Sequence, residues 1–142
     1  MKVNLSQLQL KEIHIKEFIL EENLEGQNKF SIDMDFEPIL IKKNEKDFDG
    51  LLVKVKINDR LKNVKLKVKT ELVAIFEFNG DLSKEKRAMM LLYNGLSIVY
   101  GFLRGLIFQK CSYISPQDRI IPNINIAELI EKTVDRELSK ED

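Results

Sequence analysis

The feature that most constrains this chain is the run NGLSIVYGFLRGLIF at residues 94–108, which has the length of a helix and is apolar almost all the way round. A helix that packs against one neighbour needs only an apolar stripe, and polar side chains fill the rest of its circumference. This run carries a single charge, on Arg104. It therefore predicts a helix that protein covers on more than one side.

A membrane-spanning helix is the alternative interpretation of residues 94–108. Such a helix needs roughly 20 predominantly apolar residues. The run is shorter, contains Arg104, and is bounded by Asn94 and by Gln109-Lys110. We therefore expect no membrane insertion and attribute the burial of this run to contacts with protein.

Length and charge narrow the class of protein further. A chain of 142 residues predicts one domain over residues 1–142. Lys plus Arg and Asp plus Glu both number 23, so no overall field attracts nucleic acid or acidic lipid. Cys111 is the only cysteine, which excludes an internal disulfide framework, and the first residues lack the pattern of a signal peptide. We expect a cytoplasmic protein that does not bind nucleic acid.

Alternation of apolar and polar residues predicts about four strands, over residues 8–15, 30–37, 51–57 and 64–78. A phase slip between Leu10 and Ile13 indicates a bulge in the first strand. Pro38 ends the second strand or places it at a sheet edge, and residues 39–50 are interpreted as a loop or edge segment. The connections are too short for helical crossovers, so the strands are predicted to be antiparallel.

The period then changes to that of helices. Asp81 or Ser83 caps a predicted helix through KEKRAMMLLY, which is expected to end at Asn94-Gly95. A second helix runs from there to about Ser112, and the capping-box pattern of Asn125 and Glu128 precedes a third, amphipathic helix. This order predicts an α+β domain, with a four-stranded antiparallel sheet and C-terminal helices on one face.

Candidate catalytic groups are few. His14 is the only histidine and lies within an alternating strand, and Cys111 follows a very apolar helix, where cysteine is typically a small packed hydrophobe. No Ser or Cys triad and no glycine-rich phosphate loop of known spacing is present in the sequence. We expect neither an enzyme nor a bound cofactor.

Two charged stripes have a functional and a simpler interpretation. Asp33, Asp35 and Glu37 share one strand face, and a hard cation binds several such oxygens, but flat strand carboxylates lack the surrounding loop of a cation site. A solvated strand face is the favoured interpretation, and no metal is expected. The lysines of the predicted hairpin are natural cross-strand partners for them, or a docking surface for an acidic protein. These lysines are Lys54, Lys56, Lys65, Lys67 and Lys69.

Gly101 and Gly105 are spaced G-x-x-x-G in the apolar run, which allows two backbones to approach closely. In a helix without a polar face, this spacing indicates that one side packs on the sheet while another meets a second chain. The apolar surface that remains is either core or a groove for extended apolar segments.

The segment LSIVYGFLRGLIFQKCSYISPQDRIIPNINIAEL resembles the C-terminal signature of SecB, the export chaperone, and of SecB-like proteins. Arg104 takes the place of the helix arginine, and residues 121–126 take the place of the proline-asparagine loop. The start, LQLKEIHIKEFILE, is similar to the first strand of that family. The resemblance implies a dimer of dimers that assembles through the helices and binds unfolded chains in apolar grooves without ATP.

The resemblance also implies positions for both sites. The client groove is expected at Phe36, Ile39, Ile41, Phe48, Leu96, Val99, Tyr100, Leu103 and Leu106. Contacts between subunits are expected at Gly101, Arg104, Gly105 and Phe108. An acidic side chain at Leu103 is accordingly expected to disrupt assembly or client binding.

Two departures from the family matter. Gly101 stands near the place of a proline, and this neutral chain has a lysine-striped hairpin where the export chaperone docks the SecA motor through carboxylates. These departures weaken the prediction of docking to SecA, and a client outside export, such as an aggregation-prone antitoxin, is equally compatible with the resemblance. The rival hypothesis is an oligomeric scaffold or adaptor, in which subunit contacts use the whole helix and no groove remains.

Overall fold

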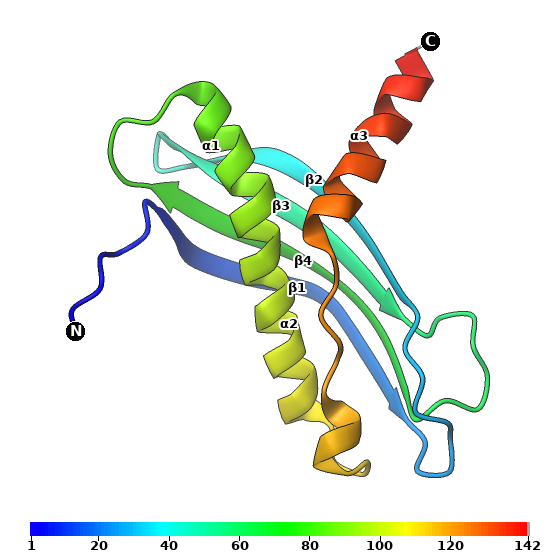
Figure 1. The fold of residues 1–142 in the computed structure, drawn as a ribbon. Helices are drawn as coiled ribbons and strands as arrows, with labels where there is room; N and C mark the ends of the chain where they lie inside the picture. Colours follow the sequence, from blue (N-terminus) through cyan, green and yellow to red (C-terminus); the bar gives the residue numbers. More distant parts are fainter. Residues whose placement is uncertain (142) are drawn as a thin grey trace.

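The computed structural model describes residues 1–141 and contains one four-stranded sheet with its helices on a single face (Figure 1). Neighbouring strands are antiparallel, in the order β1-β4-β3-β2. The predicted α+β class is confirmed, and residue 142 of the predicted domain lies outside the described residues. The elements are β1 (Leu8–Glu22), β2 (Ile32–Lys43), β3 (Lys46–Ile57), β4 (Leu66–Phe78), α1 (Lys84–Met90), η1 (Leu91–Gly95), α2 (Leu96–Lys110), η2 (Pro116–Arg119) and α3 (Ile126–Glu141).

Alternation along the central strands builds the core. On β3 and β4, every second side chain is buried beneath the helices, from Leu51 to Ile57 and from Leu66 to Phe76. The residues between them face the opposite side of the sheet, which no helix of residues 1–141 covers (Figure 1). We call that side the open face. The sheet thus has one face that is buried beneath the helices and one face that is available for contacts.

The edge strand β1 contains the predicted bulge. Its register against β4 shifts between Leu10 and Glu12, which confirms the bulge expected between Leu10 and Ile13. A second shift lies between Ile15 and Glu17. Bulges and charges interrupt the regular row of amide groups along a free edge, so β1 is poorly suited to pair with another strand.

The segment from 39 to 50 is a β-hairpin, so the predicted loop is wrong there, while the alternative of an edge segment is confirmed for residues 39–43. Strand β2 continues through Pro38 to Lys43, and the chain reverses at Asn44 and Glu45, whose φ angles are 53° and 62°. Two consecutive residues with positive φ match the twist of the strands that they join. Pro38 does not end the strand, but the predicted edge position is correct, because β2 is the outer strand beside β3.

The turn between β3 and β4 is organised by a buried side chain. Asn58 is fully buried with φ 60°, and its amide donates to the carbonyls of Lys29 and Leu66 at 2.7 and 2.8 Å. Its Oδ1 accepts from the N–H of Ser31 at 2.7 Å. One side chain thus ties the start of β2 to the start of β4.

The sequence predicted a helix end at Asn94-Gly95, and this prediction is wrong. Segments α1, η1 and α2 form one continuous helix of 27 residues, in which η1 is a π-helical turn. Gly95 is helical and buried, and a Cβ there would lie 3.1 Å from Leu51 Cδ1 and 3.5 Å from Phe76 Cζ. This glycine therefore permits close approach of the helix to the sheet and does not cap a C-terminus.

By length and composition alone, this 27-residue helix would be able to cross a bilayer, a test that core helices of soluble proteins also pass. Here its inner side rests on the sheet, with Leu96 and Val99 fully buried. The packed sheet accounts for the apolar character of that side of the helix.

The last helix, α3, begins as predicted. Oδ1 of Asn125 accepts from the N–H of Glu128 at 3.0 Å, while the Glu128 carboxylate pairs with Lys132 at 2.7 Å. The apolar stripe of α3 is covered only in its first half, where Ile130 is 3% exposed. Val134 and Leu138 are about half exposed, at the end of the helix that projects away from the sheet (Figure 1).

Candidate functional site

The inner side of α2 belongs to the core. Leu96, Val99 and Leu103 are at most 1% exposed, and they pack against the buried face of the sheet. These residues were expected in the client groove. Because they are sealed between helix and sheet, they offer no surface to another molecule in this structure.

Tyr100 and Arg104 hold the crossing segment that leads to α3. The Tyr100 hydroxyl donates to the carbonyl of Pro122 at 2.5 Å, and burial raises the pKa of this hydroxyl. Arg104 Nε donates to the carbonyl of Ile121 at 2.8 Å, and its Nη1 donates to Asn123 Oδ1 at 2.6 Å. Arg104 was expected in contacts between subunits, but here its guanidinium binds its own chain.

The outer side of α2 is apolar and uncovered. Gly101 and Gly105 are exposed, and a Cβ at either position would meet nothing within 4 Å. Ile98, Phe102 and Phe108 flank them and are 36–41% exposed. We call these five residues the outer face of α2. Gly101, Gly105 and Phe108 were expected in subunit contacts, and their placement leaves that prediction open.

A second apolar surface lies on the open face of the sheet, at the β2–β3 hairpin end. Ile39 and Ile41 lean over Gly50, where a Cβ would lie 3.0 Å from Ile39 Cγ1 and 2.7 Å from Ile41 Cδ1. Beside them, Phe48 and Ile75 line a hollow of about 400 Å³. We call Ile39, Ile41, Phe48 and Ile75 the open-face patch. Because residue 50 has no side chain, the isoleucines fold down and leave the patch shallow.

Charged side chains surround this hollow. Its rim contains Lys11, Lys43, Lys46, Glu12 and Glu77. They are paired, with Lys46 at 3.0 Å and Lys11 at 3.5 Å from the Glu77 carboxylate and Lys43 bound to Glu12. Hydrogen bonds and charge from Lys46 lower the pKa of Glu77, and those from Lys43 and His14 lower the pKa of Glu12. The rim therefore offers both signs of charge around an apolar floor.

The other half of the open face is a ladder of opposite charges. The register places Lys54 beside Asp35 on one side and Glu71 on the other, and it places Lys56 beside Asp33. This confirms Lys54 and Lys56 as cross-strand neighbours of Asp35 and Asp33, whereas Lys69 lies opposite Lys56 and Lys65 pairs with Asp118. Around Lys54, this part of the face is neutralised by carboxylates on both sides, which weakens its attraction for an acidic protein.

The nine predicted groove residues do not line one continuous groove. Leu96, Val99, Tyr100 and Leu103 are buried, and Leu106 is half-buried on the same helix. Phe36 is half-buried on the helix side of β2, opposite Val53. Ile39, Ile41 and Phe48 lie on the other side of the sheet. Client binding by these residues stays a prediction, and only the last three share a surface.

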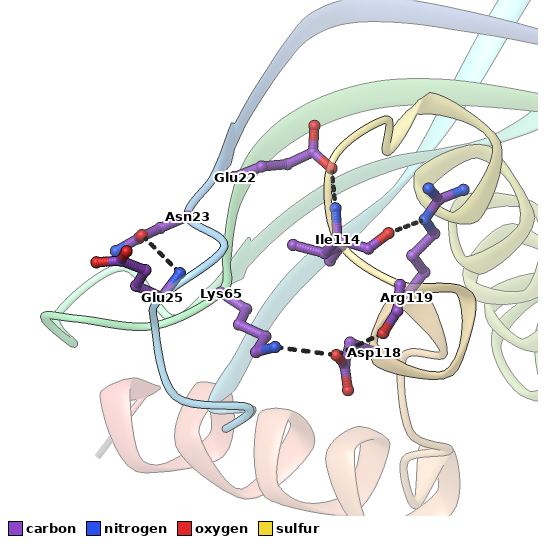
Figure 2. A network of polar contacts seen from close by, with 8 residues as sticks. Glu22, Asn23, Glu25, Lys65, Ile114, Asp118 and Arg119 are labelled. Carbon is purple, nitrogen blue, oxygen red and sulfur yellow. Dashed lines mark hydrogen bonds and ion pairs between the residues drawn. The ribbon is translucent and has the colours of Figure 1, made fainter.

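Polar contacts anchor the segment after α2 to the sheet (Figure 2). Oε1 of Glu22, at the end of β1, accepts from the N–H groups of Ser112 and Tyr113 at 2.9 and 3.1 Å. Lys65, before β4, pairs with Asp118 at 3.1 Å. Two strand ends thus fix the segment on which the crossing to α3 depends.

His14 and Cys111 are the two candidate reactive side chains from the sequence, and they lie in different environments. His14 is exposed on β1, where Nε2 lies 2.8 Å from a Glu12 oxygen. Burial, followed by the nearby Glu22 charge, raises the pKa of the Cys111 thiol to about 11, so it stays protonated at neutral pH. Within residues 1–141, no group of three or more His, Cys, Asp or Glu side chains is placed to hold a metal ion.

Sequence reasoning missed Ile98 and Phe102, although a signal for them was present. Ile98, Gly101, Phe102 and Gly105 follow the spacing i, i+3, i+4, i+7, which places them on one helix face. Ile75 was also missed, although an apolar residue between the core positions Ala74 and Phe76 is predicted to lie on the opposite face of the strand. Glu22 carried no local signal, because its partners lie 90 residues away.

No protein-family model matches this chain, and no curated protein matches it. Among solved structures, the chain is similar to the SecB-like chaperone of Mycobacterium tuberculosis in complex with a ChAD peptide from the HigA1 antitoxin. The two chains are 13% identical with a TM-score of 0.43, and the alignment covers 72% of this chain and 80% of that chain.

Proposed function

We propose that this protein is a SecB-like, ATP-independent holdase that acts in the cytoplasm and binds unfolded or aggregation-prone polypeptides. The observation that carries the proposal is the open-face patch, whose Ile39, Ile41 and Phe48 are half-buried and whose Ile75 is 6% exposed, with a rim of both charges. Burial of apolar area contributes roughly 25 cal/mol per Å² and has no directional requirement, so one such surface accepts many sequences. The rim provides partners for polar groups of either sign that flank an apolar client segment.

Self-association through the outer face of α2 is the second part of the proposal. Two helices pack closely where side chains are absent, and Gly101 and Gly105 leave the space above the helix backbone open. Ile98, Phe102 and Phe108 supply apolar area on both sides of that line. Because assembly then covers α2, the patch on the opposite side of the sheet stays available to clients.

The test is light scattering from a chemically unfolded client that is diluted into buffer without ATP. Suppression of aggregation is expected at near-equal numbers of client chains and protein subunits. Phe48→Ser removes a half-buried ring from the patch and should weaken suppression, whereas Tyr113→Ser, at an aromatic that is 72% exposed elsewhere, should not. Equal suppression by both variants would move the client site away from the patch.

A scaffold or adaptor without a client site is the rival function. It predicts that the folded oligomer neither suppresses client aggregation nor binds a hydrophobic dye, because assembly would cover all large apolar surfaces. If the folded protein fails in both assays, the holdase proposal is refuted and the scaffold is favoured.

A further inference from the structure

Residues 1–5 have the alternating pattern of a strand and no strand partner. Met1, Val3 and Leu5 alternate with polar residues and are the most exposed large apolar side chains of the chain, at 117%, 81% and 86%. Within the described part of the chain, residues 1–5 form no hydrogen bond. We call residues 1–7 the arm. Period-two alternation in an extended segment is typical of a strand that covers one apolar and one polar surface.

The free edge of β2 offers the backbone groups that such a segment needs. Ser31 accepts from the N–H of Asn58, so the antiparallel pattern directs the groups of Asp33 and Asp35 toward β3. The groups of Ile32, Met34 and Phe36 then point away from the sheet. Pro38, which has no N–H, falls on the same outward series, where it costs no bond to β3.

The two sides of this edge match the two sides of the arm. On the helix side, Ile32 and Met34 lie beside Leu129 of α3 in a cleft of about 640 Å³ whose remaining lining residues are charged, among them Arg60 and Arg136. On the open face, Asp33 and Asp35 present exposed carboxylates. A strand added here places alternate residues on alternate faces. Met1, Val3 and Leu5 would then lie on the helix side, beside Ile32, Met34 and Leu129, while Lys2 would lie beside the carboxylates.

The arm is too short to reach the β2 edge of its own chain. Seven extended residues span at most about 25 Å. The position outside β2 lies four strand spacings from β1, about 19 Å. Phe36 also lies in one row across the sheet with Ile15, through Val53 and Leu72. Ile15 lies seven residues, about 23 Å, along β1 from Leu8, where the arm joins the strand. The direct path from Leu8 to the position beside Phe36 is therefore about 30 Å, which is longer than the extended arm. An arm that pairs with this edge must come from a second copy of the chain.

We propose that the arm of one subunit adds as a fifth strand to the free edge of β2 in a second subunit. In the antiparallel arrangement Val3 lies opposite Met34, which places Lys2 opposite Asp35. Arg136 of α3 now lies 3.7 Å from Asp35, but both side chains are more than half exposed and such pairs are weak. Lys2 therefore replaces Arg136 beside Asp35 when the arm docks. This contact is separate from the outer face of α2 and from the open-face patch.

Cross-linking between two singly substituted proteins tests the contact directly. Lys2→Cys and Asp35→Cys, each in a Cys111→Ser background, are mixed and oxidised, so every link between unlike chains is intermolecular. Opposite residues that do not share hydrogen bonds have Cα atoms about 4.5 Å apart, within disulfide range. A disulfide dimer is expected from this mixture. Lys16→Cys, on the other edge strand, is the control partner and should not react with Lys2→Cys.

A second experiment measures how much the apolar side chains of the arm contribute to self-association. Val3→Asp combined with Leu5→Asp should raise the concentration for half-association at least about tenfold, whereas Val3→Ile should leave it unchanged. Sedimentation measures both. Association of the double variant at wild-type concentrations, or cross-linking with Lys16→Cys and not with Asp35→Cys, would overturn the proposal. Cross-linking and sedimentation involve no client. A failure to suppress client aggregation would therefore count against the holdase proposal and leave the proposed arm contact unaffected.

Discussion

Replacing Gly101 and Gly105 by alanine is expected to shift subunit stability and self-association in opposite directions. Both glycines lie inside α2, and a Cβ at either meets nothing within 4 Å. Alanine loses less backbone entropy than glycine on forming a helix, by about 0.5–1 kcal/mol per site. The double variant should therefore gain about 1–2 kcal/mol of unfolding free energy as an isolated subunit. For a chain of this size, that raises the melting temperature by about 3–6 °C.

The same two methyl groups should weaken assembly, because they occupy the line along which a second helix approaches. We expect the concentration for half-association to rise at least about tenfold in sedimentation experiments. Urea unfolding at a concentration below association measures the stability term alone, since association itself stabilises the folded state. Gly95→Ala is the control: it faces the sheet 3.1 Å from Leu51, so it should gain less stability than either outer site.

Two results would refute this reasoning. If the double variant associates like the wild type, α2 does not form the subunit contact and Gly101 and Gly105 have no role in assembly. If the isolated subunit loses stability, the outer face of α2 is not open as the structure describes.

Three further substitutions test the packing that supports these surfaces. Leu103→Ala should lower the free energy of unfolding by about 3–4 kcal/mol in urea titrations, because Leu103 is a core residue and its truncation leaves a cavity. A loss below about 1 kcal/mol would contradict that placement. Asn58→Ala should cost about 3 kcal/mol through three lost hydrogen bonds, measured in the same way, and wild-type stability would contradict their role. Burial raises the pKa of Glu22, but the N–H groups of Tyr113 and Ser112 outweigh it and hold the pKa below the ordinary 4.5. The carboxylate therefore stabilises the fold above pH 4.5 and loses this effect as the pH falls through the lower folded value, so the stability difference from Glu22→Gln should shrink on acidification. A difference that is constant with pH would contradict this.

Local pattern alone was sufficient for much of the framework. The alternation of β3 and β4 predicted which side chains enter the core, because a strand directs successive residues to opposite faces whatever its neighbours are. The bulge near Leu10 and the cap at Asn125 were also readable, since each depends on residues within a few positions of one another.

Some sequence patterns are compatible with two different structures, and only the fold showed which one forms. Asn94-Gly95 has the composition of a helix end, yet Gly95 serves close packing on Leu51 within a continuous helix. Pro38 and residues 39–50 have the composition of a loop, yet they form a hairpin at the sheet edge, where a missing N–H costs nothing.

The candidate surfaces depended most on tertiary structure. Residues 94–108 are apolar almost all round, so the sequence predicted that this helix is covered on more than one side without showing which side faces the sheet. The fold placed Leu103 inside and left Phe102 outside, although the two are adjacent and equally apolar. It also turned Arg104 toward Ile121 and brought Glu22 to the backbone at 112–114. Periodicity is a property of neighbouring residues, whereas the choice among equivalent apolar positions depends on which distant strand they meet.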